Sequence, residues 1–131
     1  MFIDASAAIS ILSGEDDAAD LARRLEQAET PMVSPLSLYE TIAGLARKRA
    51  CPVEEAEALV DQFVAEVGAT NVDISPPIGR LAVEAFARFG KGRHKADLNM
   101  GDCFAYACAR IHDVPLLFKG NDFGFTDILS A

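Results

Sequence analysis

The sequence has few cysteines and no apolar run long enough to cross a bilayer. Its three cysteines, Cys51, Cys103 and Cys108, are odd in number and match no metal-binding spacing. We interpret them as reduced, mostly buried side chains. The chain starts with a strand-like segment at residues 1–3, without a basic segment before an apolar one. Together with the missing membrane-length run, this start predicts a soluble, cytoplasmic protein.

Internal repeats and low-complexity segments are also absent. The chain has 131 residues, of which 50% are apolar, and this composition suits a compact domain with a sizeable core. We therefore expect one domain that comprises residues 1–131.

Basic residues are scarce, with 12 Lys and Arg against 20 Asp and Glu, and the formal net charge is −8. This balance argues against a protein that coats nucleic acid by charge alone. A nuclease remains possible, because a cluster of acids that needs divalent cations would itself contribute several negative charges. For a nuclease, the positions of the few basic residues matter more than the net charge. Seven of the 12 fall within residues 47–49 and 88–95.

Short apolar segments alternate with amphipathic helical segments along the chain. Strands are predicted at residues 1–3, 31–35, 70–74 and 114–119, and the tail at 123–131 is available as an edge strand or docking segment. Helices are predicted at residues 5–12, 15–28, 36–50, 53–67, 76–89 and 99–111. This alternation implies an α/β fold with a parallel sheet, helices on both faces and right-handed crossovers.

Four acidic residues lie at equivalent places along these elements. Asp4 ends the first strand, Glu40 lies about a turn into the helix after the second strand, and Asp122 follows the fourth strand. Asp102 begins the helix before the fourth strand, at its third position if Asn99 is the N-cap. Because ligands of open parallel sheets bind beyond the carboxyl ends of the strands, we expect these carboxylates at one edge of the sheet.

Four carboxylates gathered at one edge would repel one another, and their pKa values would rise unless a cation neutralised them. A hard divalent ion such as Mg²⁺ takes oxygen ligands and keeps waters for reaction. Such a site suits phosphodiester hydrolysis, in which the metal activates a water, orients the scissile phosphate and stabilises charge on the leaving oxygen.

Each acid also has a purely structural explanation. Asp4 fits a turn or an N-cap, Asp102 favours the positive end of a helix dipole, and Asp122 fits a turn. Glu40 fits a capping box with Ser37, because Ser-x-x-Glu is the expected pattern. The pattern alone leaves two alternatives open, a shared metal site and unrelated acids at a sheet edge.

Four segments of the chain together resemble the PIN-domain family, and within it the VapC-type toxins of bacterial toxin–antitoxin pairs. The segments are residues 1–7 (MFIDASA), 33–40 (VSPLSLYE), 98–107 (LNMGDCFAYA) and 116–123 (LLFKGNDF). The resemblance implies a three-layer α/β/α sandwich with a mostly parallel sheet of four to five strands. It also implies Mg²⁺- or Mn²⁺-dependent endoribonuclease activity, a homodimer, and inhibition by a small VapB-type antitoxin.

The resemblance assigns an acidic quartet by position, namely Asp4, Glu40, Asp102 and Asp122. Asp4 and Asp102 are then the direct metal ligands, while Glu40 and Asp122 hold a second metal or metal-bound waters. Relatives often carry another acid just before the last one, where this chain has Asn121. We expect the one missing charge to weaken the binding of a second metal.

Ser6 matches the family's small hydroxyl residue near the first acid. The resemblance implies that it hydrogen-bonds the Asp4 carboxylate, and the alternative is an ordinary hydroxyl at a helix start. Ser6 also bears on a competing function, a phosphatase with Asp4 as its nucleophile. Enzymes of the haloacid dehalogenase type usually place a second acid two residues after that nucleophile, where this chain has Ser6. This difference disfavours the phosphatase.

A glycine-broken basic loop supplies Lys91, Arg93 and Lys95 as candidate RNA-binding residues. They would guide RNA phosphates toward the acids without selecting a sequence, and a solvated glycine-rich loop is the alternative. We interpret the run at residues 47–49 as a helix end that could also touch phosphate. A further alternative for the whole chain is a catalytically inert PIN-like module that binds a partner, which the intact acidic quartet disfavours.

Overall fold

The computed structural model describes residues 1–131 and contains a four-stranded sheet in which every pair of neighbouring strands is parallel. The strands are β1 (Phe2–Ile3), β2 (Met32–Val33), β3 (Thr70–Asn71) and β4 (Leu116–Leu117), in the spatial order β3-β2-β1-β4. The chain runs outward from β1 through β2 to β3 and then crosses back to place β4 on the other side of β1. The strand order therefore reverses between β1 and β4, which is where ligands bind in open parallel sheets.

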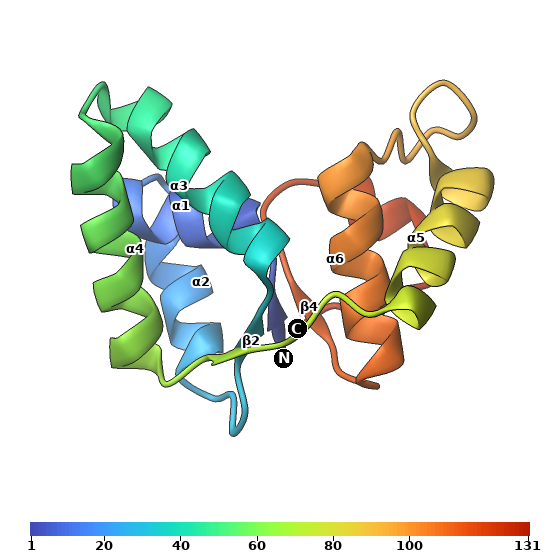
Figure 1. The fold of residues 1–131 in the computed structure, drawn as a ribbon, viewed down its shortest axis with the longest axis horizontal. Coiled ribbons are helices and arrows are strands. Elements are labelled where there is room, and N and C mark those ends of the chain that lie inside the picture. The colour runs from blue at the N-terminus through green and yellow to red at the C-terminus, as the bar shows by residue number, and fades with distance from the viewer.

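Six α-helices and one short 3₁₀ helix surround this sheet. They are α1 (Ala5–Ser13), α2 (Ala18–Leu25), α3 (Pro35–Arg49), α4 (Val53–Val67), α5 (Pro76–Phe89), α6 (Met100–Ile111) and η1 (Asp122–Phe125). Figure 1 shows α1 to α4 on one side of the strands and α5 with α6 on the other. No helix combines the length and the apolarity that crossing a membrane requires.

The two faces of the sheet contribute to two separate hydrophobic clusters. Phe2 and Leu116 pack with α5 and α6, while Ile3 and Leu117 pack with α1, α2 and α4. Successive side chains of a strand point to opposite faces, so even a two-residue strand supplies one side chain to each layer. The predicted α/β/α sandwich with a mostly parallel sheet is confirmed.

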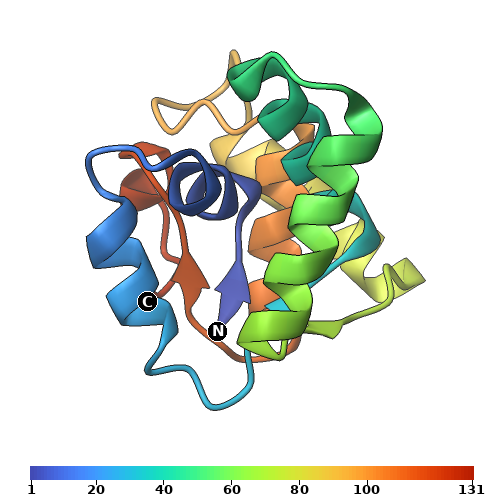
Figure 2. The same ribbon diagram turned by 90° about the vertical axis from the view of Figure 1, so that its left-hand side faces the viewer.

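A third cluster packs α3 against α4, which run side by side in Figure 2. It is formed by Leu45, Ala56 and Val60, all of them fully buried. This packing holds α3, and with it Glu40, as part of a helix pair rather than as an isolated helix.

The start of α3 differs from the predicted capping box. Ser34 is the N-cap, its Oγ accepts the Ser37 N–H at 3.1 Å, and Ser37 Oγ accepts the Ser34 N–H at 2.9 Å. The helix begins one residue earlier than predicted, at Pro35, because proline suits the first helical position. The structural explanation of Glu40 as a capping residue is therefore wrong.

The helix predicted over residues 15–28 is shorter, since α2 covers only the middle of that range. Glu15 forms ion pairs with Lys48 and Lys119. Glu15 therefore connects the loop after α1 to the end of α3 and to the segment after β4. It does not belong to the first turn of α2.

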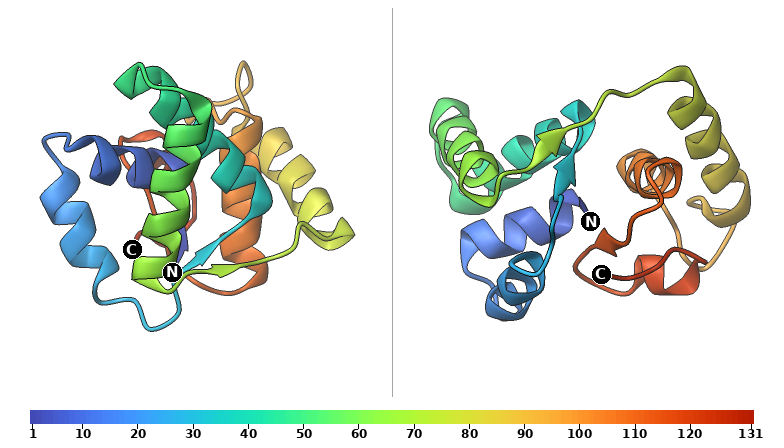
Figure 3. Two further views of the ribbon diagram at one scale, coloured as in Figure 1. Left: turned by 60° about the vertical axis from the view of Figure 1, so that its left-hand side comes forward. Right: turned by 90° about the horizontal axis from the view of Figure 1, so that it is seen from below.

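The C-terminal tail forms a single bridge along β4 rather than a fifth strand. The backbone N–H of Leu116 donates to the Leu129 carbonyl at 2.8 Å, and the Leu116 carbonyl accepts the Ala131 N–H at 2.9 Å. In the right-hand view of Figure 3 the chain end lies beside β4. The tail thus covers the outer edge of β4, which protects an otherwise unpaired strand edge.

Candidate active site

Three of the four predicted acids line one cavity of about 370 Å³, at the carboxyl-terminal edge of the sheet. Asp4 comes from the end of β1, Glu40 from α3 and Asp102 from the first turn of α6. In Figure 1, α3 and α6 stand on opposite sides of β1. The other lining residues are Ala5, Ser6, Ile9, Tyr39, Ala43, Gly44, Arg47 and Asn99.

Asp4 is the N-cap of α1 and is only 4% exposed. Its Oδ2 accepts the backbone N–H of Ser6 at 3.0 Å and the Ser6 hydroxyl at 2.5 Å. Burial raises the pKa of the Asp4 carboxyl, and the hydrogen bonds from Ser6 oppose that rise. Ser6 Oγ in turn accepts the backbone N–H of Lys119 at 3.0 Å. The hydrogen bond predicted for Ser6 is present, and it links the first acid to the segment after β4.

Asp102 forms a reciprocal capping box with Asn99. Asp102 Oδ2 accepts the Asn99 backbone N–H at 3.0 Å, and Asn99 Oδ1 accepts the Asp102 backbone N–H at 2.9 Å. Burial raises the pKa of Asp102 to about 6, the bond from Asn99 opposes this, and the charges of Asp4 and Asp122 add to it. Because the box uses only Oδ2, the capping role leaves Oδ1 free to face a ligand.

Glu40 reaches across the cavity to the start of α6. A Cβ added at Gly101 would collide with the Glu40 carboxylate, so only glycine allows this approach without a shift. Burial raises the pKa of Glu40 to about 7, with further contributions from the charges of Asp4 and Asp102. The first turn of α6 also presents the positive end of a helix dipole, which favours a carboxylate there.

Asp122 is not part of the cavity wall. It is exposed at the start of η1, next to the equally exposed Asn121. Its charge nevertheless contributes to the raised pKa of Asp102, which places it within electrostatic reach of the cavity. The structure therefore brings three of the predicted acids together and leaves the fourth outside the wall.

None of these four carboxylates has a basic partner, since every ion pair of the protein lies elsewhere. As the side chains stand, no three His, Cys, Asp or Glu residues converge on a single ion position. Mg²⁺ usually requires only one or two carboxylates and keeps waters in its remaining positions. Asp4 and Asp102 fit such an ion, because each has one carboxylate oxygen that takes no part in its cap. Their role as metal ligands stays a prediction.

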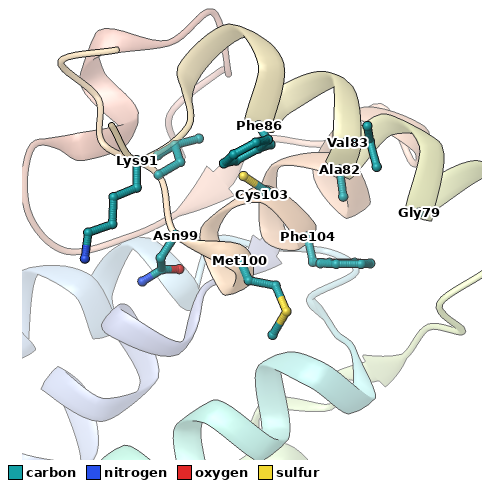
Figure 4. A pocket seen from close by; sticks show the side chains of 10 residues that line it. Gly79, Ala82, Val83, Phe86, Lys91, Asn99, Met100, Cys103 and Phe104 are labelled. Atoms are coloured by element: carbon teal, nitrogen blue, oxygen red, sulfur yellow. The ribbon is translucent and has the colours of Figure 1, made fainter. Parts of the chain in front are cut away.

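The predicted RNA-binding residues lie outside the acidic cavity. The Arg93 guanidinium carbon lies 5.6 Å from the centre of the Phe86 ring, and Lys95 Nζ lies 5.0 Å from that of Phe125. Lys91 borders a separate, mostly apolar hollow between α5 and the start of α6 (Figure 4). Aromatic contacts thus engage two of these three cations, and their role in RNA binding stays a prediction.

The cavity wall also contains Tyr39 and Arg47. The sequence pattern alone assigns no functional role to Tyr39, and it places Arg47 in a helix end that could also touch phosphate. The available signal was their spacing, since Tyr39, Ala43 and Arg47 recur every four residues and therefore share one face of a helix that also carries Glu40.

The raised pKa of Glu40 predicts a pH dependence of stability in the absence of divalent cations. Its pKa rises from 4.5 in the unfolded chain to about 7 in the folded protein, so the folded state holds the proton more tightly. The resulting stabilisation is complete below pH 4.5 and is lost as the pH rises through about 7. Asp102, whose pKa rises from 3.8 to about 6, acts in the same direction.

Urea denaturation in chelator across this pH range measures the effect. We expect Glu40→Gln to flatten the upper part of the profile, because the amide has no charge to bury, whereas Glu57→Gln on the exposed face of α4 leaves the profile unchanged. A Glu40→Gln profile identical to the wild type would show that Glu40 is not the group responsible.

Comparison with known proteins agrees with this architecture. The PIN domain family model matches residues 1–128. A VapC ribonuclease of Rhizobium meliloti (strain 1021) is 40% identical over 97% of this chain and 98% of that protein. Ribonuclease VapC28 of Mycobacterium tuberculosis is 39% identical over 100% of this chain and 97% of that protein.

Two solved structures share the fold at low sequence identity. The crystal structure of the Mycobacterium tuberculosis toxin VapC20, which cleaves the sarcin-ricin loop, has a TM-score of 0.77 at 16% identity and covers 99% of this chain and 97% of that one. A toxin–antitoxin complex from Klebsiella pneumoniae has a TM-score of 0.72 at 18% identity. The match covers 99% of this chain and 95% of the chain in that structure. From the family match and the full-length relatives, the chain belongs to the PIN-domain family, among the VapC proteins.

Proposed function

We propose that this protein is a metal-dependent endoribonuclease that acts as the toxin of a toxin–antitoxin pair. The observation that carries the proposal is the cavity in which Asp4, Glu40 and Asp102 meet without a basic partner. The names of the full-length relatives, which are ribonucleases, support the same reaction class.

The proposed cofactor is Mg²⁺ or Mn²⁺. Asp4 and Asp102 would hold it, and Glu40 with Asp122 would hold a second ion or metal-bound waters. When bound, such an ion lowers the pKa of a water and stabilises negative charge on the phosphate and the leaving oxygen.

Hydrogen bonds within the protein fix the orientation of the Asp4 and Asp102 carboxylates before any ion binds. Ser6 fixes Asp4, and Asn99 fixes Asp102, each through one carboxylate oxygen, which leaves the second oxygen for another partner. Glu40, beside both, accepts a hydrogen bond from the attacking water and orients it. In the reaction the water oxygen bonds to phosphorus and loses a proton to solvent, one bridging P–O bond breaks, and the released oxygen takes up a proton from solvent.

We propose a small VapB-type antitoxin as the inhibitor and a homodimer as the working form. The Klebsiella pneumoniae structure that shares this fold is a toxin–antitoxin complex. The hollow between α5 and α6 exposes Val83, Phe86 and Met100 and offers apolar surface that a partner chain would bury (Figure 4).

Cleavage of total bacterial RNA by the purified, antitoxin-free protein tests the proposed function. We expect discrete fragments with Mg²⁺ or Mn²⁺ that disappear in chelator. Asp4→Asn and Asp102→Asn keep the shape and the capping ability of each side chain but remove its charge, so we expect the cleavage rate to fall on the order of 100-fold. Asp61→Asn, on the exposed face of α4, is the matched control and should cleave like the wild type.

Retained cleavage in Asp4→Asn and Asp102→Asn would contradict the assignment of these acids. A folded protein that cleaves nothing with either metal, and whose melting temperature does not rise with Mn²⁺, would instead support an inert partner-binding module. Binding of a cation to the native state alone must stabilise it, so the thermal shift separates that case from an unsampled substrate.

Gly101→Ala tests whether the position of Glu40 matters. The added Cβ occupies the place of the Glu40 carboxylate, and displacing a positioning group by about 1 Å can reduce the rate on the order of 100-fold. Folding should be retained, because the group that must move is the end of a flexible side chain and alanine favours a helix over glycine by about 1 kcal/mol.

Gly79→Ala is the matched control, because a Cβ at Gly79 in α5 would meet no atom within 4 Å. We expect this variant to cleave RNA at the wild-type rate and to melt at the same or a slightly higher temperature. If Gly101→Ala also retains the wild-type rate, the approach of Glu40 to α6 is irrelevant to the reaction.

A further inference from the structure

Of the three consecutive basic residues that end α3, only Arg47 lines the acidic cavity. Lys48 forms an ion pair with Glu15, and Arg49 donates a hydrogen bond to the Leu12 carbonyl at 3.3 Å. Arg47 is exposed and takes part in none of the ion pairs or side-chain hydrogen bonds of the protein. Its guanidinium group is therefore available to an incoming anion.

Tyr39, like Arg47, is exposed and has no interaction partner of its kind among the contacts of the protein. Three Phe or Tyr side chains are exposed, and two of them, Phe86 and Phe125, contact the cations Arg93 and Lys95. The Tyr39 side chain is 70% exposed, and its ring has no aromatic or cationic partner. It is the one exposed Phe or Tyr ring of the protein without an aromatic or cationic contact.

Tyr39 and Arg47 lie on one stripe of α3, two helical turns or about 12 Å apart. The cavity wall between them is formed by small residues, Ala43 and Gly44. A ligand that spans both side chains can therefore lie close against the helix, with Glu40 next to one of its ends.

We propose that Tyr39 and Arg47 form a nucleotide-binding wall of the cavity, on which Tyr39 stacks against an unpaired base and Arg47 binds a phosphate of the same strand. This inference rests on the proposed ribonuclease function and names single-stranded RNA as its substrate class. Stacking requires an open base face, which a duplex does not offer.

Charge supports the placement of Arg47. The protein has a formal net charge of −8, and the cavity itself holds three acids, so its overall charge does not attract a phosphate. An unpaired guanidinium on the wall provides a local attraction, and its planar donors match the geometry of a phosphate.

Fluorescence anisotropy with a fluorescein-labelled RNA of about twelve nucleotides tests the proposal. The RNA is offered as a mixed-sequence single strand and as a fully paired duplex, with Ca²⁺ in place of Mg²⁺, so that binding is measured separately from cleavage. The variants are Tyr39→Ala, Tyr39→Phe, Tyr39→Leu and Arg47→Ala. Arg80→Ala, which removes an exposed cation from α5 that does not line the cavity, is the charge-matched control.

We expect Tyr39→Ala to raise the Kd for the single strand roughly tenfold, the effect of losing one stacked base. Tyr39→Phe should restore binding because it keeps the planar ring, whereas Tyr39→Leu should not. Arg47→Ala should weaken binding and reduce the slope of log Kd against log salt by about one, as expected for one lost phosphate contact, and Arg80→Ala should leave that slope unchanged.

The outcomes separate this inference from the proposed function. If the wild type binds the single strand with these losses in the variants but cleaves no RNA, the wall is supported and the ribonuclease proposal fails. If the wild type cleaves RNA and the Tyr39 and Arg47 variants bind and cleave as it does, the wall is refuted. Absence of RNA binding by the wild type, or equal losses on the duplex and the single strand, also overturns the inference.

Discussion

The burial of three neighbouring carboxylates is the constraint on which the rest of the site depends. Asp4, Glu40 and Asp102 line one cavity, and none of them forms an ion pair, although Arg47 lines the same cavity. Burial raises the pKa of each carboxyl, and the charges of neighbouring carboxylates add to the rise for Glu40 and Asp102. Such an arrangement opposes folding at neutral pH, so the surrounding structure must hold it in place. The parallel pairing of β1 with β4 and the packing of α3 against α4 supply that framework.

Structural and chemical roles coexist in the same side chains. Asp4 caps α1 and Asp102 closes the capping box of α6, as a purely structural explanation requires. Each cap, however, engages a single carboxylate oxygen. Capping therefore fixes the direction of the carboxylate and leaves its second oxygen for another partner. For Glu40 no capping role exists, and its carboxylate lies against Gly101 in the other wall of the cavity.

The sequence predicted the parts that depend on local patterns. The order of strands and helices and the Asn99 cap follow from apolar periodicity and capping residues, and α4 has the predicted bounds. The strands lie within the predicted ranges but are shorter, with two residues each. The misplaced capping box arose because Ser34 and Ser37 both suit an N-cap, and the choice between them depends on where Pro35 starts the helix. The ion pairs of Glu15 were missed because Lys48 and Lys119 are distant in sequence.

The proposed reaction requires that the acidic cavity bind a divalent cation. A crystal structure of the protein grown with Mn²⁺ tests it most directly, because the anomalous scattering of manganese locates the ion independently of any refined coordinates. We predict a peak within coordination distance of Asp4 and Asp102, with the Asp102 capping box intact. If both carboxylates are ordered and manganese peaks appear only elsewhere, the acidic cavity does not bind the ion.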